Sequence, residues 1–209
     1  LWKSPAQEFQ RLDPLPEPMR DIHDAVFRHN GDLLLATSDG IWLHRTAAVA
    51  WNRWHTPSAS ARNRIDEILP LRNGDIWIGT DGGVEVRHAD GTVSWHEQAL
   101  GVDLRIITGL AEDAEGGVWV SSGAYWEGAF RFYDGVWRFY HGEDGLSASR
   151  IHRIHRDDEG RLWFLGLGTS TGASRNSHSA IATYHEGRFD AFHLEGSLAH
   201  GRIHSFAQG

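Results

Sequence analysis

A turn-and-strand unit recurs along the chain at a nearly fixed period, and this feature constrains the fold more than any other. The clearest copy, residues 73–84, reads as an Asn-Gly turn, a short strand, an Asp-Gly-Gly turn and the start of a second strand. Asn-Gly and Asp-Gly between apolar residues favour hairpins, because glycine adopts the positive φ that tight turns need. The glycines that anchor the four copies are spaced 43, 42 and 44 residues apart, at Gly31, Gly74, Gly116 and Gly160. Such a period is typical of a repeat architecture.

Each repeat contains four candidate strands with turn signals between them and no useful helical periodicity. The expected strands are 22–27, 32–37, 41–44 and 49–55; 65–71, 75–79, 84–88 and 93–97; 107–112, 118–122, 129–133 and 136–141; and 151–156, 162–165, 180–185 and 188–193. Four short strands per repeat of this length are the signature of a β-propeller blade. The sequence therefore predicts an all-β fold: a β-propeller with four complete four-stranded antiparallel blades and partial blades at both ends.

The domain organisation follows from the same register. We expect a single propeller segment over residues 1–209, with blades at approximately 20–62, 63–105, 106–150 and 151–202. Residues 1–19 align with the stretch before each later repeat, and residues 203–209 open a fifth repeat, so both are expected to be partial strands. Because a lone outer strand and a short inner strand do not complete a blade, we expect a segment of a larger propeller.

Composition excludes several classes of function. The formal net charge of −8 argues against a nucleic-acid partner, which a basic face normally binds. The absence of cysteine excludes disulfides, thiol chemistry and thiolate metal sites. No apolar run approaches the roughly 20 residues of a membrane-spanning helix. Zinc-protease, phosphate-loop and serine-nucleophile motifs are missing too, so no catalytic residue, metal site or cofactor is predicted.

Residues 149–164, Ser-Arg-Ile-His-Arg-Ile-His-Arg-Asp-Asp-Glu-Gly-Arg-Leu-Trp-Phe, resemble the repeat of the two-component-regulator propeller family. The core of that repeat is an acidic-Gly turn followed by Leu-Trp, an aliphatic residue and Gly-Thr. Residues 73–83 match equally well, and Gly-Glu-Asp-Gly-Leu-Ser at 142–147 matches the family's Asp-Gly-Leu lead-in. The departures are Leu34 in place of Trp, and Ser121-Ser122 and Leu165-Gly166 in place of Gly-Thr.

This resemblance implies the extracytoplasmic, periplasmic part of a bacterial membrane-bound sensor, whose ligands are often carbohydrate fragments. We therefore expect a non-enzymatic, ligand-sensing segment that takes part in signal transduction. Its expected partners are a small molecule or an oligosaccharide and the neighbouring propeller blades or domains. Two alternatives stay open, because a fold does not determine a function. One is a carbohydrate-active lyase or hydrolase on a propeller, and the other is a purely structural protein-interaction module.

Polar residues recur eight positions before each anchoring glycine, where the inner strand of a blade begins. They are His23, Asp66, Thr108, His152 and, in the fifth repeat, His204; arginines stand nearby at Arg64, Arg105, Arg150 and Arg202. In a propeller, the starts of the inner strands meet at one mouth of the central channel. The residues form either a pocket there or strand caps and ion pairs with acidic turns. Metal binding by the histidines is disfavoured, because no ligand set is close in sequence.

The loops between the second and third strands are enlarged in the third and fourth blades, at 123–128 and 166–179. Both loops should project from the face that carries the His and Arg register, and binding usually resides on such loops. Aromatic rings there would stack on a sugar, and arginines would bind carboxylate or sulfate groups; contacts between propellers or subunits are the competing use. The candidate ligand-binding residues are Tyr125, Trp126, Arg150, His152, Arg175, His178, Arg202 and His204.

Two further patterns carry structural predictions. Trp77, Trp119 and Trp163 occupy one position of the repeat, and we expect each of them to be buried between adjacent blades. The acidic run at 157–160 has a composition that suits calcium, but its position in the repeat predicts a solvated turn.

Overall fold

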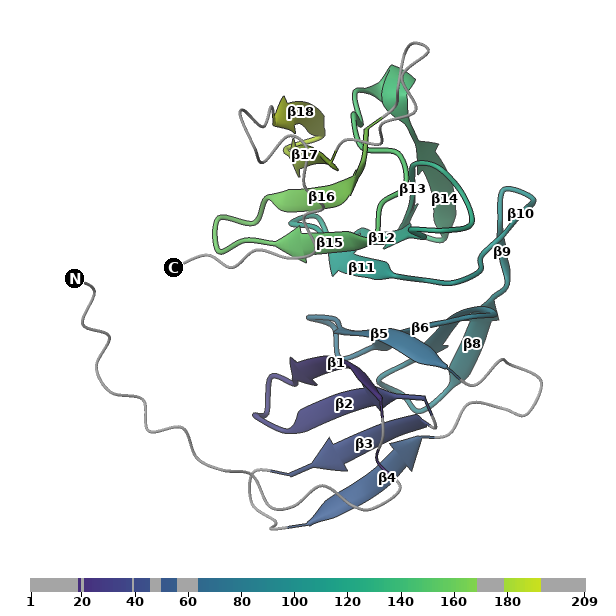
Figure 1. Cartoon of the computed structure of the whole chain (residues 1–209). Helices are drawn as coiled ribbons and strands as arrows, with labels where there is room; N and C mark the ends of the chain where they lie inside the picture. Colours follow the sequence, from purple (N-terminus) through teal and green to yellow (C-terminus); the bar gives the residue numbers. More distant parts are fainter. Residues whose placement is uncertain are drawn as a thin grey trace.

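The structure, a computed structural model, describes residues 19, 21–38, 40–45, 50–55, 64–168 and 179–192. These residues form four four-stranded antiparallel sheets, and within each sheet the strands are paired in chain order (Figure 1). The strands are β1 (Ile22–Phe27), β2 (Leu33–Thr37), β3 (Gly40–His44) and β4 (Trp51–His55); β5 (Ile65–Pro70), β6 (Ile76–Thr80), β7 (Gly83–Arg87) and β8 (Val93–His96); β11 (Gly109–Glu112), β12 (Val118–Ser121), β13 (Ala129–Tyr133) and β14 (Val136–Tyr140); and β15 (Arg153–Arg156), β16 (Leu162–Leu167), β17 (Ser179–His185) and β18 (Arg188–Phe192). The predicted propeller fold is confirmed.

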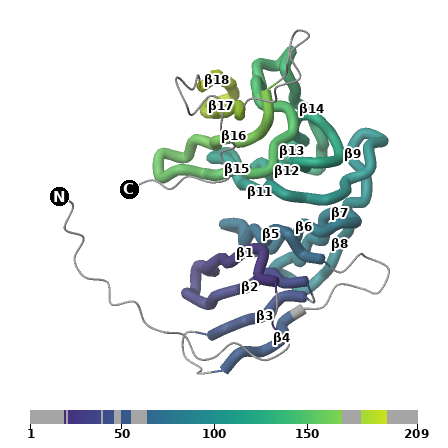
Figure 2. Tube along the Cα trace, in the orientation of Figure 1, coloured from purple at the N-terminus to yellow at the C-terminus, as the bar shows by residue number. Residues whose placement is uncertain are grey.

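The four sheets are the blades of the propeller, which we number one to four in chain order. Their first strands, β1, β5, β11 and β15, pack against one another in this sequence and lie innermost, while β4, β8, β14 and β18 lie at the outside (Figures 1 and 2). The partial strands expected at 1–19 and 203–209 fall outside the described residues, apart from Met19. In the part of the chain that is described, no helix is long and apolar enough to cross a membrane.

The anchoring glycines make the turns that the sequence predicts. Gly31, Gly74, Gly116 and Gly160 all have φ between 83° and 93°, in the left-handed region. Each donates its backbone N–H to the carbonyl three residues earlier, as Gly31 does to Arg28 at 2.8 Å. A residue with a Cβ is strained at this φ, so the glycine register fixes where each first strand ends and each second strand begins.

Two short elements were not anticipated. A two-stranded hairpin, β9 (Gln98–Ala99) and β10 (Val102–Asp103), connects blade two to blade three. A single 3-10 turn, η1 (Gly142–Asp144), follows β14 and ends at Gly145, whose φ is 95°. Both elements lie in connections between blades, outside the sixteen strands that the repeat predicts.

Apolar side chains fill the space between successive blades. Leu34 of blade one packs with Ile76 and Ile78 of blade two. Trp77, 3% exposed, packs with residues of blade three, and its ring centroid lies 5.5 Å from that of Phe132. Because each interface joins strands that are about forty residues apart in sequence, the core is built from the repeat register.

The predicted burial of the repeated tryptophans is confirmed for two of them and wrong for the third. Trp119 is fully buried between blades three and four, against Phe164, Tyr184 and Phe189. Trp163 is only half-buried. Each of the first two rings is covered by the blade that follows its own, and the described residues end in the blade that carries Trp163.

The prediction of a solvated acidic turn at 157–160 is wrong for Asp157, whose side chain is buried. Its side chain is 4% exposed, and its carboxylate accepts hydrogen bonds from Trp163 Nε1 at 2.8 Å and Arg161 Nε at 2.9 Å. Burial alone would raise the pKa of Asp157, but these hydrogen bonds outweigh it and lower the pKa to about 2. The carboxylate is therefore occupied by N–H donors and holds the turn together.

Candidate functional site

The enlarged loop of blade three lies against the chain that leads into β15. The backbone N–H of Gly123 donates to Thr108 Oγ1 at 2.9 Å, and the Thr108 hydroxyl donates to the carbonyl of Ile151 at 3.3 Å. A Cβ added to Gly123 would lie 2.9 Å from Cβ of His152, so only glycine allows this approach. At the other end of the loop, Gly128 N–H donates to the carbonyl of Ser149 at 2.9 Å.

This loop carries an exposed aromatic ring beside one arginine, and it covers a segment that holds two further basic residues. Tyr125 is 47% exposed, and Arg105 Cζ lies 5.7 Å from the centre of its ring, in a cation–π contact. Arg150 is exposed and His152 is half-buried, and both belong to the segment that the loop covers. We call Arg105, Tyr125, Arg150 and His152 the loop face.

Trp126 does not contribute its ring to this surface. It is 9% exposed and belongs to the core between blades two and three, with its ring centroid 5.6 Å from that of Phe130. A buried ring offers no surface on which a sugar can stack, so a substitution at Trp126 is expected to act on stability.

The other predicted residues divide into two groups. Arg175, His178, Arg202 and His204 lie outside the described residues. In the first two blades, the same register is used for local contacts: His23 Nε2 lies 3.0 Å from Ser38 Oγ, and Arg64 pairs with Asp66 at 2.7 Å. In these two blades, the register residues therefore form strand caps and ion pairs, as the second of the two interpretations expected. The ligand-binding role of the predicted residues stays a prediction.

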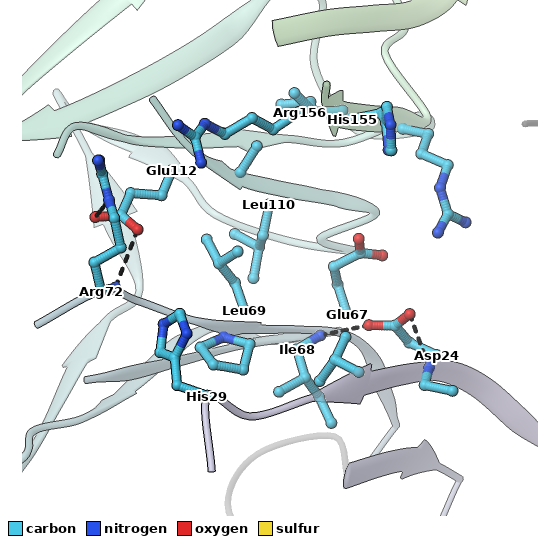
Figure 3. Close-up of a pocket in the computed structure, with 16 residues that line it drawn as sticks. Asp24, His29, Glu67, Ile68, Leu69, Arg72, Leu110, Glu112, His155 and Arg156 are labelled. Atoms are coloured by element: carbon cyan, nitrogen blue, oxygen red, sulfur yellow. Dashed lines mark hydrogen bonds and ion pairs between the residues drawn. The ribbon is translucent and has the colours of Figure 1, made fainter. Parts of the chain in front are cut away.

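A cavity that sequence reasoning missed lies at the centre of the propeller. It has a volume of about 310 Å³ and is lined by β1, β5, β11 and β15 and the ends of those strands (Figure 3). Seven positions before the anchoring glycines stand Asp24, Glu67, Gly109 and Arg153. Three of these four residues line the cavity. The glycine register, extended by one position, would therefore have found them.

The carboxyl groups of Asp24 and Glu67 are held in different ways. Asp24 accepts backbone hydrogen bonds from Ile68 at 3.0 Å and Ala25 at 2.9 Å, and so ties blade one to blade two. Glu67 extends into the cavity, toward the wall formed by β15 (Figure 3). Burial, with a smaller contribution from Asp24, raises the pKa of Glu67 well above its ordinary value. Burial also raises the pKa of Asp24, while Arg153 acts to lower both.

An ion pair between two lining residues lies at the end of the cavity where the inner strands finish. Arg72 Nε lies 3.2 Å from Glu112 Oε1, and the Arg72 backbone N–H donates to Glu112 Oε2 at 3.1 Å. This pair joins blade two to blade three and is drawn at one side of Figure 3. Within the described ranges, no group of three or more His, Asp or Glu residues is arranged to hold a metal ion.

No protein-family model and no curated protein matches the sequence. Among solved structures, a virginiamycin B lyase from Staphylococcus aureus with quinupristin is 15% identical with a TM-score of 0.66; the match covers 89% of this chain and 60% of that one. The extracellular domain of a hybrid two-component system of B. thetaiotaomicron is 18% identical with a TM-score of 0.63, over 86% of this chain and 24% of that one. A second extracellular domain from B. thetaiotaomicron, of a one-component system, is 16% identical with a TM-score of 0.55, over 88% and 31%.

At these identities the likeness establishes the β-propeller fold and nothing finer. The chain spans less than two thirds of the length of each of these structures. Its structural neighbours include both extracellular domains of bacterial signalling systems and a lyase, so the fold is shared by proteins of different function.

Proposed function

We propose that the chain is a non-enzymatic, ligand-binding propeller segment of a bacterial membrane-bound signalling receptor of the two-component-regulator type, placed in the periplasm. The proposed ligand is an acidic oligosaccharide, and the proposed site is the loop face. The observation that carries the proposal is the half-exposed Tyr125 ring, which lies under Arg105 and on the same loop that covers the segment of Arg150 and His152.

The chemistry of the loop face suits such a ligand. Guanidinium groups bind carboxylate or sulfate through paired N–H donors. An exposed tyrosine ring offers a flat surface against which a sugar ring packs. The chain as a whole has a net charge of −8, so an acidic ligand would be repelled elsewhere and would be attracted to this local group of cations.

The fold comparison supports the receptor setting, because extracellular domains of two bacterial signalling systems share the propeller. The family resemblance of the repeats points the same way. An enzyme is the competing function, since a lyase and a gluconolactonase are also structural neighbours. A histidine beside an arginine on the loop face is a pair of residue types that base-catalysed chemistry on an acidic sugar would use.

Calorimetric titration with an oligogalacturonate, and with a neutral maltooligosaccharide of equal length, tests the proposal. We expect weak binding of the acidic sugar alone, falling as salt is raised because surface charges are screened. Binding should be lost in Arg150→Ala and Tyr125→Ala. Arg138→Ala removes another exposed arginine, from the outer strand β14, and should leave binding intact.

Two results would overturn the proposal. Equal binding of the neutral and acidic sugars, or no binding of either, would remove the loop face as an acidic-sugar site. Shortening of the oligogalacturonate during incubation, abolished by His152→Ala, would replace the binding function with an enzymatic one.

A further inference from the structure

The central cavity carries opposite charges on facing walls, and these charges do not pair with each other. Glu67 and Asp24 come from blades two and one, and Arg153 and Arg156 come from β15 in blade four. Neither Glu67 nor Arg153 makes a hydrogen bond or an ion pair within 4.0 Å among the described residues. Arg153 is nevertheless close enough to act electrostatically on both carboxyl groups.

Glu67 is half-buried, and a carboxylate that is partly withdrawn from water without a partner is destabilising, so a protein normally pairs it or removes it. The acidic wall, from β1 and β5, and the basic wall, from β15, are separated by the cavity, and both border the same space (Figure 3). Between them, the surface includes apolar side chains, among them Leu69 and Leu110. The volume of about 310 Å³ is at the lower end of the range for small-molecule sites.

We propose that this cavity binds a small zwitterion, with a cationic nitrogen against Glu67 and Asp24 and a carboxylate against Arg153. A molecule with one charge of each sign would pair both walls at once. A dianion would meet Glu67 with a like charge, and a dication would do the same at Arg153. Amino-acid chemistry, an ammonium group and a carboxylate on a short apolar skeleton, fits the charges and the volume.

The contacts of the neighbouring groups support this assignment. Asp24 already accepts two backbone hydrogen bonds, which orient its carboxylate without neutralising it. Arg72 and Glu112 satisfy each other at the far end and are not needed by a ligand. The unused charges are therefore concentrated at Glu67 and Arg153, on opposite walls.

Proton release on ligand binding would distinguish a ligand-binding Glu67 from a carboxyl group with a purely structural role. Burial and Asp24 raise its pKa, so the carboxyl retains a proton more readily when no cation is present. A bound ammonium group favours the ionised form and expels that proton. Ligand binding should therefore release protons at a pH at which Glu67 is still protonated in the empty cavity.

Three four-carbon compounds that differ only in their end groups provide the test: γ-aminobutyrate, putrescine and succinate, each titrated into the whole chain by calorimetry. We expect γ-aminobutyrate to bind best and succinate to bind at least about tenfold more weakly, the size of effect that one charged hydrogen bond gives. Titrations in two buffers of different ionisation enthalpy should show proton release with γ-aminobutyrate.

Two variants test which wall of the cavity binds the ammonium group and which binds the carboxylate. Glu67→Gln should weaken γ-aminobutyrate and putrescine by about tenfold and abolish proton release. Arg153→Gln should remove the preference for γ-aminobutyrate over putrescine. Glu143→Gln changes an exposed carboxylate on η1 and should alter neither, and melting curves of each variant check that it folds.

The proposal is overturned if succinate binds as tightly as γ-aminobutyrate, if none of the three compounds binds at millimolar concentration, or if Glu67→Gln binds like the unmodified chain. Because the cavity and the loop face use different residues, Glu67→Gln should retain oligosaccharide binding. Failure of one proposal is therefore distinguishable from failure of the other.

Discussion

Blades three and four carry the same local device in different surroundings. In both, an aspartate accepts a hydrogen bond from the indole six residues later: Asp113 from Trp119 at 2.9 Å, and Asp157 from Trp163 at 2.8 Å. An arginine pairs with each carboxylate, Arg131 in blade three and Arg161 in blade four. Yet Trp119 is fully buried and Trp163 is not. The Asp and Trp within each of these two blades determine the hydrogen bond, and the following blade determines the burial.

The largest expected difference between the two blades concerns these indoles. Trp119→Ala should lower the free energy of unfolding by about 3–5 kcal/mol, the usual cost of deleting a buried aromatic side chain. Trp163→Ala should cost clearly less, because part of its ring already faces solvent. Denaturant melts of both variants measure the difference. Equal losses would mean that Trp163 is as well covered as Trp119.

A smaller difference is expected for the two carboxylates. The side chain of Arg131 is 8% exposed, whereas that of Arg161 is 38% exposed. Asp113→Asn leaves the Arg131 guanidinium buried with only Glu115 to pair with, and should cost about 3 kcal/mol. The loss of unfolding free energy in Asp157→Asn should be about 1 kcal/mol smaller than in Asp113→Asn, because water reaches the Arg161 guanidinium and solvates its charge. A melt in which Asp157→Asn is the less stable variant would contradict this order.

The two aspartates should also make the protein sensitive to acid. Their pKa values are lower in the folded state than the ordinary 3.8, because hydrogen bonds from the arginines and indoles outweigh the opposing effect of burial. Their contribution to stability is therefore complete above about pH 4 and is lost as the pH falls toward 2, the folded pKa of Asp157. Urea melts between pH 5 and pH 2 should show this loss. It should be reduced in Asp157→Asn, and an unchanged slope in that variant would refute the assignment.

The stability contribution of Glu67 in the cavity should depend on pH in the opposite direction. The pKa of Glu67 is raised in the folded state, so its ionisation opposes folding once the pH exceeds the ordinary value near 4.5. Glu67→Gln removes that penalty and should raise the midpoint of unfolding slightly at pH 7, with no gain at pH 4. Glu143→Gln, on the surface, serves as the control. A destabilised Glu67→Gln protein at pH 7 would show that the carboxylate has a partner when the cavity is empty.

Much of the fold could be read from residues that are near neighbours in sequence. The turns at Gly31, Gly74, Gly116 and Gly160 require positive φ, and that requirement places all sixteen blade strands within one or two residues of their observed ends. The hairpin at 98–103 escaped notice because only one connection between blades contains it. On the loop face, sequence reasoning placed the loop beside His152 but not the burial of Trp126.

What the sequence by itself determined is the blade: its strands, its turns and the recurrence of Trp at one position in three of the four blades. These depend on backbone preferences and hydrogen bonds that act over a few residues. The tertiary structure decided which of two equivalent indoles is buried, and that Glu67 and Arg153 line the same cavity. Exposure and charge pairing depend on groups that stand about forty or more residues apart in the chain. Only the packing of four blades around one centre brings those groups together.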